Sequence, residues 1–308
     1  MGATLQAVTA EIPRGKIDEV ADTLTGRGVF FSTWEDCEGG PSRISTYIPD
    51  DPASPDWAPY RGMLFPSPGE AAEVLADVCA ECGVPAVMQV TEIRQEDWAE
   101  SWKRFFTTIR VSPRLTVRPP WEDYSPAPGE RVLVLDPGMS FGTGRHATTQ
   151  ACLQLLDALA VEDPRRAVLD IGCGSGILSI AASLLGFQGV RGIDNDPDAV
   201  RIAAENAAAN GAAADFSTCD LAACTEKAPV VVANVLATVL EKFAGEVAGC
   251  VARVPGCALI LSGILDAQYD AVRRAYAALG AAEENSVLIG EWRTGLFRFE
   301  ADAPRAGA

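Results

Sequence analysis

The sequence of 308 residues predicts an α/β protein in two parts, and two patterns favour this fold. From Ala167 onward, apolar strand-like runs alternate with helical runs, which is typical of a mostly parallel sheet covered on both faces. Over the first ninety-odd residues the order is β-α-β-β-α-β, which is typical of a ferredoxin-like α+β domain. We expect the domains to be 1–94 and 119–308, joined by a linker helix and strand at 95–118.

The first domain reads as strands and helices separated by clear turn signals. Gly26 and Gly28 end the first helix, and the run "CEGGP" is a good hairpin turn. Residues 49–68 are rich in proline and aspartate, so we expect an exposed loop there. The expected elements are a strand at 4–12, a helix at 16–26, strands at 29–36 and 42–48, a helix at 69–83 and a strand at 86–94.

The linker contains an aromatic stripe. Trp98, Trp102 and Phe106 recur at every fourth position, which places them on one face of a helix. We expect this helix to pack its aromatic side chains against a domain and so to fix how the two domains are oriented. A binding role for these rings is the alternative.

The second domain is expected to hold a sheet of seven strands. No helix separates the last two strands, so they should pair antiparallel at one edge of the sheet. The expected strands are 167–171, 190–194, 214–218, 230–234, 257–263, 285–290 and 294–300, and the expected helices are 177–186, 198–210, 237–252 and 266–279.

Composition and charge restrict the possible partners. The net charge is −17 and clusters of lysine and arginine are missing, which disfavours direct binding to nucleic acid and favours a cationic partner. An acidic surface that only maintains solubility explains the charge equally well. There is no run of eighteen apolar residues and no signal-peptide pattern, and nine scattered cysteines fit reduced thiols. We therefore expect a cytoplasmic protein that binds neither a membrane nor a metal ion.

A glycine turn follows the first strand of the second domain. In "VLDIGCGSG", Gly172, Gly174 and Gly176 allow a ligand to approach backbone N–H groups at the start of a helix. Asp194 ends the next strand, where an acidic residue can accept both ribose hydroxyls. A dinucleotide fingerprint would need glycine where Ile177 stands, and no P-loop sequence is present. The pattern favours S-adenosylmethionine bound by Gly172, Gly174 and Asp194.

Asn234 ends the fourth strand, in "VVVANVL". The carboxyl ends of parallel strands meet at one edge of a sheet, so this side chain should face the same crevice as the glycine turn. Its amide could accept a hydrogen bond from a donor nitrogen or orient the methionine part of the cofactor. The alternative role is to cap the following helix.

Five motifs together resemble one family. "DPGMSFGTGRHATT", "VLDIGCGSG", "GIDNDP", "VANVL" and "SGIL", in this order and spacing, resemble the PrmA family of bacterial methyltransferases, which modify lysines of large-subunit ribosomal protein eleven. The similarity extends to "DWAESWKRFF" and to the first domain, so it covers nearly the whole chain. Its most specific element is "FGTG-x-H-x-TT".

The resemblance implies a Rossmann-like class I methyltransferase domain and S-adenosylmethionine as cofactor. It also implies methyl transfer to lysine side-chain and N-terminal amines of a basic ribosomal protein. The first domain would recognise this substrate. The residues implied as donor contacts are Thr149, Gly172, Asp194 and Asn234.

The chain departs from the family pattern at Arg145, at Ala147 and through the apparent insertion at 49–68. These departures weaken the inference about which protein is methylated. A lysine methyltransferase of the same architecture that acts on another cytoplasmic protein is therefore the main alternative. The more distant alternatives are a nicotinamide-dependent oxidoreductase and a binding module with a vestigial donor site.

The segment 136–150 is expected to be a loop that folds over the cofactor, with Phe141 as an apolar wall and Thr149 in contact with the donor. His146, the chain's one histidine, is either a general base or a ring that orders this loop. An amine that loses its proton to water before entry needs no catalytic acid–base pair, so the sequence assigns no catalytic residue.

Overall fold

The computed structural model describes residues 4–13, 15–29, 31–34, 42–49, 64–94, 107–136 and 146–302. The chain divides into two compact units, Met1–Phe105 and Phe106–Ala308. The expected linker helix with Trp98, Trp102 and Phe106, most of the expected loop 49–68, and Phe141 lie outside the described residues.

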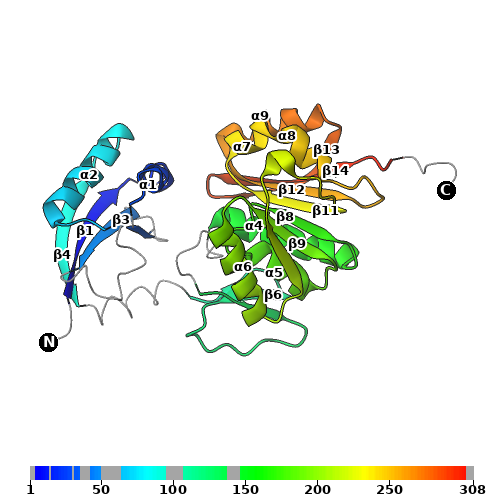
Figure 1. Ribbon diagram of the computed structural model, residues 1–308, viewed down its shortest axis with the longest axis horizontal. Coiled ribbons are helices and arrows are strands. Elements are labelled where there is room, and N and C mark those ends of the chain that lie inside the picture. Colours follow the sequence, from blue (N-terminus) through cyan, green and yellow to red (C-terminus); the bar gives the residue numbers. More distant parts are fainter. Residues whose placement is uncertain are drawn as a thin grey trace. The chain divides into compact units, whose positions relative to one another are not determined.

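The first unit has the predicted β-α-β-β-α-β order. Its four strands form an antiparallel sheet in the order β2-β3-β1-β4 (Figure 1). Both helices pack on this sheet through buried apolar side chains, including Val8, Leu24 and Leu75. The elements are β1 (Thr4–Ile12), α1 (Ile17–Gly26), β2 (Phe31–Trp34), β3 (Ser42–Pro49), α2 (Pro68–Glu81) and β4 (Val87–Arg94).

The second unit is built on the predicted seven-stranded, mostly parallel sheet, in the order β10-β9-β8-β11-β12-β14-β13. The last two strands pair antiparallel, as expected, and β14 inserts between β12 and the edge strand β13. The strands are β8 (Val168–Ile171), β9 (Val190–Asp194), β10 (Ala214–Thr218), β11 (Val230–Asn234), β12 (Ala258–Leu265), β13 (Ala281–Ile289) and β14 (Trp292–Phe299).

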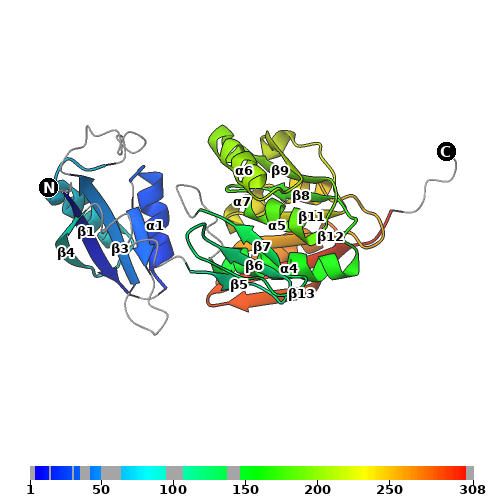
Figure 2. The same ribbon diagram turned by 90° about the horizontal axis from the view of Figure 1, so that it is seen from below.

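Helices cover both faces of this sheet (Figures 1 and 2). One apolar core lies under α4 (Ala147–Glu162), α5 (Ile177–Leu185) and α6 (Pro197–Ala209). A second core lies under α7 (Ala237–Lys242), α8 (Ala244–Gly249) and α9 (Asp266–Ala277) on the opposite face. A 3-10 turn, η3 (Leu221–Ala223), follows β10. Among the helices of the described segments, none has the length and apolar character needed to span a bilayer.

The single helix expected at 237–252 is two short helices. Phe243 ends α7 and precedes α8, and its backbone leaves the helical region, with φ −109° and ψ 27°. Apolar residues on both sides of this break reach the same core, among them Leu240 and Val247. The apolar pattern therefore continues across the break and does not reveal it.

The expectation of a loop throughout 136–150 is wrong at its C-terminal end, and no helix was expected at 147–162, where α4 lies. Helix α4 begins at Ala147, so Thr148, Thr149 and Gln150 form its first turn. The apolar periodicity begins only after this turn, with the buried side chains of Leu153, Leu156 and Leu159. A pair of β-branched threonines has low intrinsic helix propensity, and tertiary contacts override it here.

The second unit also contains a small three-stranded sheet, of which the sequence predicted only one strand, in the linker. It comprises β5 (Ile109–Arg110), β6 (Leu115–Arg118) and β7 (Arg131–Val134), and its apolar side chains join the core under α4. Glu130 is buried beside it and accepts hydrogen bonds from Thr116, Tyr124 and the Ala127 amide. These bonds, with that of Thr116 the strongest, lower the pKa of Glu130 to about 2.

Candidate active site at the carboxyl edge of the sheet

The glycine turn joins β8 to α5 and is attached to the neighbouring strand. The amides of Gly172 and Cys173 donate to the Ile193 carbonyl at 2.8 and 3.0 Å. Gly172, Gly174 and Gly176 all have positive φ, between 51° and 79°, which favours glycine. The turn therefore presents backbone at the start of α5, where helix N–H groups lack partners within the helix.

Asp194 lies against this turn, as the sequence predicts. Its Oδ2 accepts a hydrogen bond from the Gly174 amide at 2.9 Å, and its Oδ1 accepts one from the Asp196 amide at 3.1 Å. A carboxylate has about four acceptor positions, so two contacts leave capacity for ligand hydroxyls. The structure thus brings Gly172, Gly174 and Asp194 together, and contact between Asp194 and a ribose stays a prediction.

Val235 sits between two glycines from neighbouring strands. β11 lies between β8 and β12, so the residue after β11 meets the ends of both neighbours. A Cβ built on Gly172 would lie 2.6 Å from Val235 Cγ1, and one built on Gly263 would overlap the Val235 carbonyl oxygen. The glycines of "VLDIGCGSG" and "SGIL" therefore make room for the backbone that carries Asn234.

Asn234 and Thr149 contact one another at this edge. The Asn234 Nδ2 atom donates to Thr149 Oγ1 at 3.5 Å, and Thr149 is only 1% exposed. The N-cap of α7 is Leu236, so the alternative role of Asn234 as the cap of that helix is wrong. The structure places the predicted residues Thr149 and Asn234 side by side, although no pattern within either motif indicates that they touch.

His146 immediately precedes α4. Its Nδ1 lies 2.7 Å from the Thr148 hydroxyl, and its ring meets that of Trp292 edge-on at 4.9 Å between centroids. These contacts favour the role of ordering the helix start over that of general base. Trp292 was not identified from the sequence, because a single aromatic residue at the start of a strand carries no spacing that links it to His146.

Asp170 is a further acidic residue that sequence reasoning missed. It is fully buried in β8, and its Oδ2 accepts hydrogen bonds from the Ser179 amide and hydroxyl. None of the described residues forms a hydrogen bond with its Oδ1. Burial, with a smaller contribution from the nearby charge of Asp194, raises the pKa of Asp170 to about 7, although the hydrogen bonds from Ser179 act in the opposite direction. A cationic ligand bound at the glycine turn would favour the ionised form of this carboxyl group.

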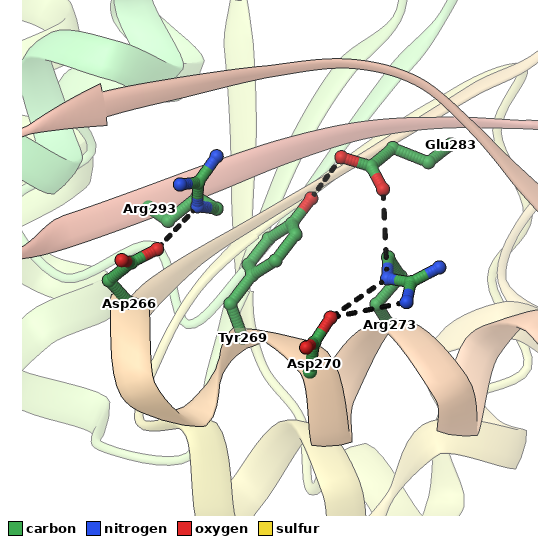
Figure 3. Close-up of a pocket in the computed structure, with 6 residues that line it drawn as sticks. All are labelled: Asp266, Tyr269, Asp270, Arg273, Glu283 and Arg293. Carbon is green, nitrogen blue, oxygen red and sulfur yellow. Dashed lines mark hydrogen bonds and ion pairs between the residues drawn. The ribbon is translucent and has the colours of Figure 1, made fainter.

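A hollow of about 350 Å³ is lined by residues of α9, β13 and β14 (Figure 3). The Tyr269 hydroxyl donates to Glu283 at 3.0 Å, while Arg273 pairs with Asp270 and Arg293 pairs with Asp266. These contacts connect α9 to β13 and β14. No residue predicted to bind the donor lines this hollow, and we assign it a structural role.

Comparison with known proteins agrees with this geometry. The family model described as "Ribosomal protein L11 methyltransferase (PrmA)" matches residues 55–299. The chain belongs to the PrmA family. PrmA relatives from Geobacter metallireducens and Geobacter sulfurreducens, both named ribosomal protein L11 methyltransferase, are 38% and 39% identical to it. These alignments cover 97% and 95% of this chain, and 99% and 97% of the relatives.

A solved structure also matches this PrmA chain. The crystal structure of ribosomal protein L11 methylase from Lactobacillus delbrueckii subsp. bulgaricus is 31% identical, with a TM-score of 0.55. The match covers 63% of this chain and all of that one. Membership of the PrmA family makes the chain an S-adenosylmethionine-dependent methyltransferase with a class I α/β fold.

The residues present fit this cofactor. The glycine turn offers backbone N–H groups, and Asp194 offers carboxylate oxygens for a ribose. The unpartnered Oδ1 of Asp170 and the charge of Asp194 suit a ligand that carries positive charge. Among the described residues, no group of three or more potential ligands is arranged to hold a metal ion.

Proposed function

We propose that this enzyme transfers methyl groups from S-adenosylmethionine to lysine side-chain and N-terminal amines of ribosomal protein L11. The observation that carries the proposal is the Asn234–Thr149 contact, which lies at the strand ends beside the glycine turn and Asp194. This arrangement provides a polar acceptor next to the expected donor site. The names of the PrmA relatives support the choice of substrate.

The bound cofactor supplies an electrophilic methyl group on a cationic sulfur. The chain must hold a neutral amine in line with the bond that breaks. A lysine with a pKa of about 10.4 costs roughly 4 kcal/mol to neutralise near pH 7.4, and partial burial reduces this cost. Loss of the proton to water before entry suffices, so no catalytic acid–base pair is required.

Asn234 is the residue we propose to orient the amine. With its Nδ2 donating to Thr149, its Oδ1 is left as the acceptor. An amine N–H bonded to Oδ1 would direct its lone pair toward the donor methyl group. The carbonyl of Val235 is a second acceptor at the same strand end.

Substrate capture is proposed to involve the first domain, residues 1–94, connected through the linker 95–118 to the catalytic domain 119–308. A net charge of −17 would attract a basic ribosomal protein and raise the rate of encounter. We place this reaction in the cytoplasm, and we propose contact with the protein substrate and not with RNA or a membrane.

The alternative substrate is another cytoplasmic protein. It rests on the departures from the family pattern at Arg145, at Ala147 and at 49–68, although the alignments with the L11 methyltransferase relatives cover 95% or more of the chain and so include the first domain. A recognition domain that has diverged could accept a different protein. Profiling methylated proteins in cells with and without the enzyme would distinguish the two substrates.

The test combines purified enzyme, a methyl donor labelled on the methyl group, and purified L11, followed by mass spectrometry. We expect label on lysine or on the N-terminal amine of L11. The variant Asp194→Ala provides the matched negative control. Absence of label on both kinds of amine would refute the assignment.

A further inference from the structure

Helix α4 begins beside the proposed acceptor site, but its N-cap residue does not cap it through its side chain. Its N-cap residue is His146, whose side chain makes no capping hydrogen bond to the helix backbone. Capping by serine, threonine or aspartate normally satisfies the orphan N–H groups of a first turn. The position of Thr149 therefore depends on contacts from elsewhere in the fold.

One such contact comes from a buried pair of hydroxyls under the helix. Ser262 Oγ donates to the Thr148 carbonyl at 3.3 Å and lies 2.6 Å from Thr294 Oγ1. A serine hydroxyl has one hydrogen, so when Ser262 donates to Thr148, Thr294 donates to Ser262. Ser262 and Thr294 are both 0% exposed, so bulk solvent does not reach this pair.

A β-bulge in β12 lies at Ser262. The β12–β14 register shifts between Leu261 and Ile264, so Ser262 and Gly263 together face Thr294. In the neighbouring ladder, Ser262 pairs with Asn234. The same irregularity therefore places Gly263 against Val235 and the Ser262 hydroxyl against α4.

Trp292 lies two residues before Thr294 on β14, and alternate residues of a strand share a face. This face of β14 carries both the Trp292 ring that meets His146 and the hydroxyl that meets Ser262. The start of α4 is thus held by β12 and β14, and Asn234 approaches Thr149 from β11.

We propose that Thr294 and Ser262 are positioning residues for methyl transfer. The hydrogen bonds from Thr294 to Ser262 and from Ser262 to the Thr148 carbonyl, here called the relay, fix the first turn of α4 and so hold Thr149 against Asn234. The proposal rests on the proposed role of Asn234 in orienting the amine. The glycine turn and Asp194 belong to β8 and β9, away from the relay. Thr149 is itself an expected donor contact, so loss of the relay should weaken donor binding as well as turnover, but turnover more, because Asp194 and the glycine turn keep their places.

The test compares Thr294→Val, which removes the hydroxyl with little change of shape, and Thr294→Ser, which keeps it. We expect Thr294→Val to lower kcat for L11 methylation about tenfold or more, because small misplacements of reacting groups cost that much. The dissociation constant of S-adenosylhomocysteine should rise by less than kcat falls, within about threefold of wild type, since Thr149 shifts while the contacts at Asp194 and the glycine turn are untouched. Thr294→Ser should retain wild-type kcat.

Hydrogen exchange gives a readout that needs no substrate. Thr294→Val should speed amide exchange in the peptide covering 146–152, and Thr294→Ser should not. Thr116→Val is the matched control: Thr116 is also a fully buried strand threonine, and its hydroxyl contacts Glu130. It should leave exchange in 146–152 at the wild-type rate.

Unchanged exchange in Thr294→Val, or equal impairment in Thr294→Ser, would overturn the relay. If wild-type enzyme fails to methylate L11, the proposed function fails instead. The exchange measurement still decides the relay in that case.

Discussion

The Asn234 side-chain amide donates to the Thr149 hydroxyl at 3.5 Å, across 85 residues of sequence. The contact joins the end of β11 to the first turn of α4. It brings one residue of "VANVL" and one of "FGTG-x-H-x-TT" to the edge where the glycine turn and Asp194 also lie. Two motifs that are separate in sequence therefore meet at one edge of the sheet.

Asn234→Asp should slow methyl transfer without changing the shape of the side chain. A carboxylate at this position would stabilise the protonated form of the incoming lysine and raise its pKa. We expect kcat near neutral pH to fall at least about tenfold and the pH–rate profile to move to higher pH. Asn285→Asp, at an exposed position of β13, should behave as wild type. A profile that keeps its midpoint would contradict the role of Asn234.

Asp194→Ala should weaken binding of the methyl donor by about 2–3 kcal/mol, the range for a lost hydrogen bond to a charged group. The side chain also holds the Gly174 amide, so its removal loosens the turn as well. Isothermal titration calorimetry with S-adenosylhomocysteine measures the change. Asp198→Ala, at an exposed position in the first turn of α6, is the control. Equal affinity of Asp194→Ala and wild type would exclude the contact.

Gly263→Ala should destabilise the protein and displace Val235. Gly263 has a φ of +80°, and its Cβ would overlap the Val235 carbonyl oxygen. We expect a loss of about 2 kcal/mol or more in the free energy of unfolding, from overlap and backbone strain together. Gly245→Ala, where a Cβ meets nothing within 4 Å, should cost little. Chemical denaturation of both variants gives the comparison, and equal costs would disprove the close contact.

Asp170→Asn should change how stability depends on pH. The folded-state pKa of Asp170 is raised to about 7, so between pH 4 and 7 the native protein binds more protons than the unfolded chain. Ionisation of this group therefore lowers the stability of the wild type as pH rises. The variant has no carboxyl group to ionise at this position. Its free energy of unfolding relative to that of the wild type should therefore rise by up to about 4 kcal/mol from pH 4 to pH 8. Urea denaturation across this range tests it, and a pH-independent difference would contradict the assignment.

The sequence predicted the seven-stranded sheet well, because long apolar runs alternate with helices from Ala167 onward. It also placed Gly172, Gly174, Asp194 and Asn234 at one edge, since strand ends in a parallel sheet converge. No helix was expected at 147–162, so all of α4 was missed; at its start, Thr148 and Thr149 are buried polar residues that break the apolar period. In the fold they contact Ser262 and Asn234, which are remote in sequence.

Two other features escaped prediction for related reasons. Trp292 joins the site through its contact with His146, which arises only when β14 inserts beside β12. Asp170 lies within the glycine motif, but its burial and unpartnered oxygen are properties of the packed core. Contacts between distant segments leave no periodicity within either segment, so pattern reasoning has nothing to detect.

A crystal structure of the protein with S-adenosylhomocysteine tests the donor site most directly. We expect the ligand at the ends of β8 and β9, with its ribose hydroxyls within hydrogen-bond distance of Asp194 and its sulfur toward Asn234. A ligand seated elsewhere, for example in the hollow beside α9, or a ribose remote from Asp194, would contradict the account.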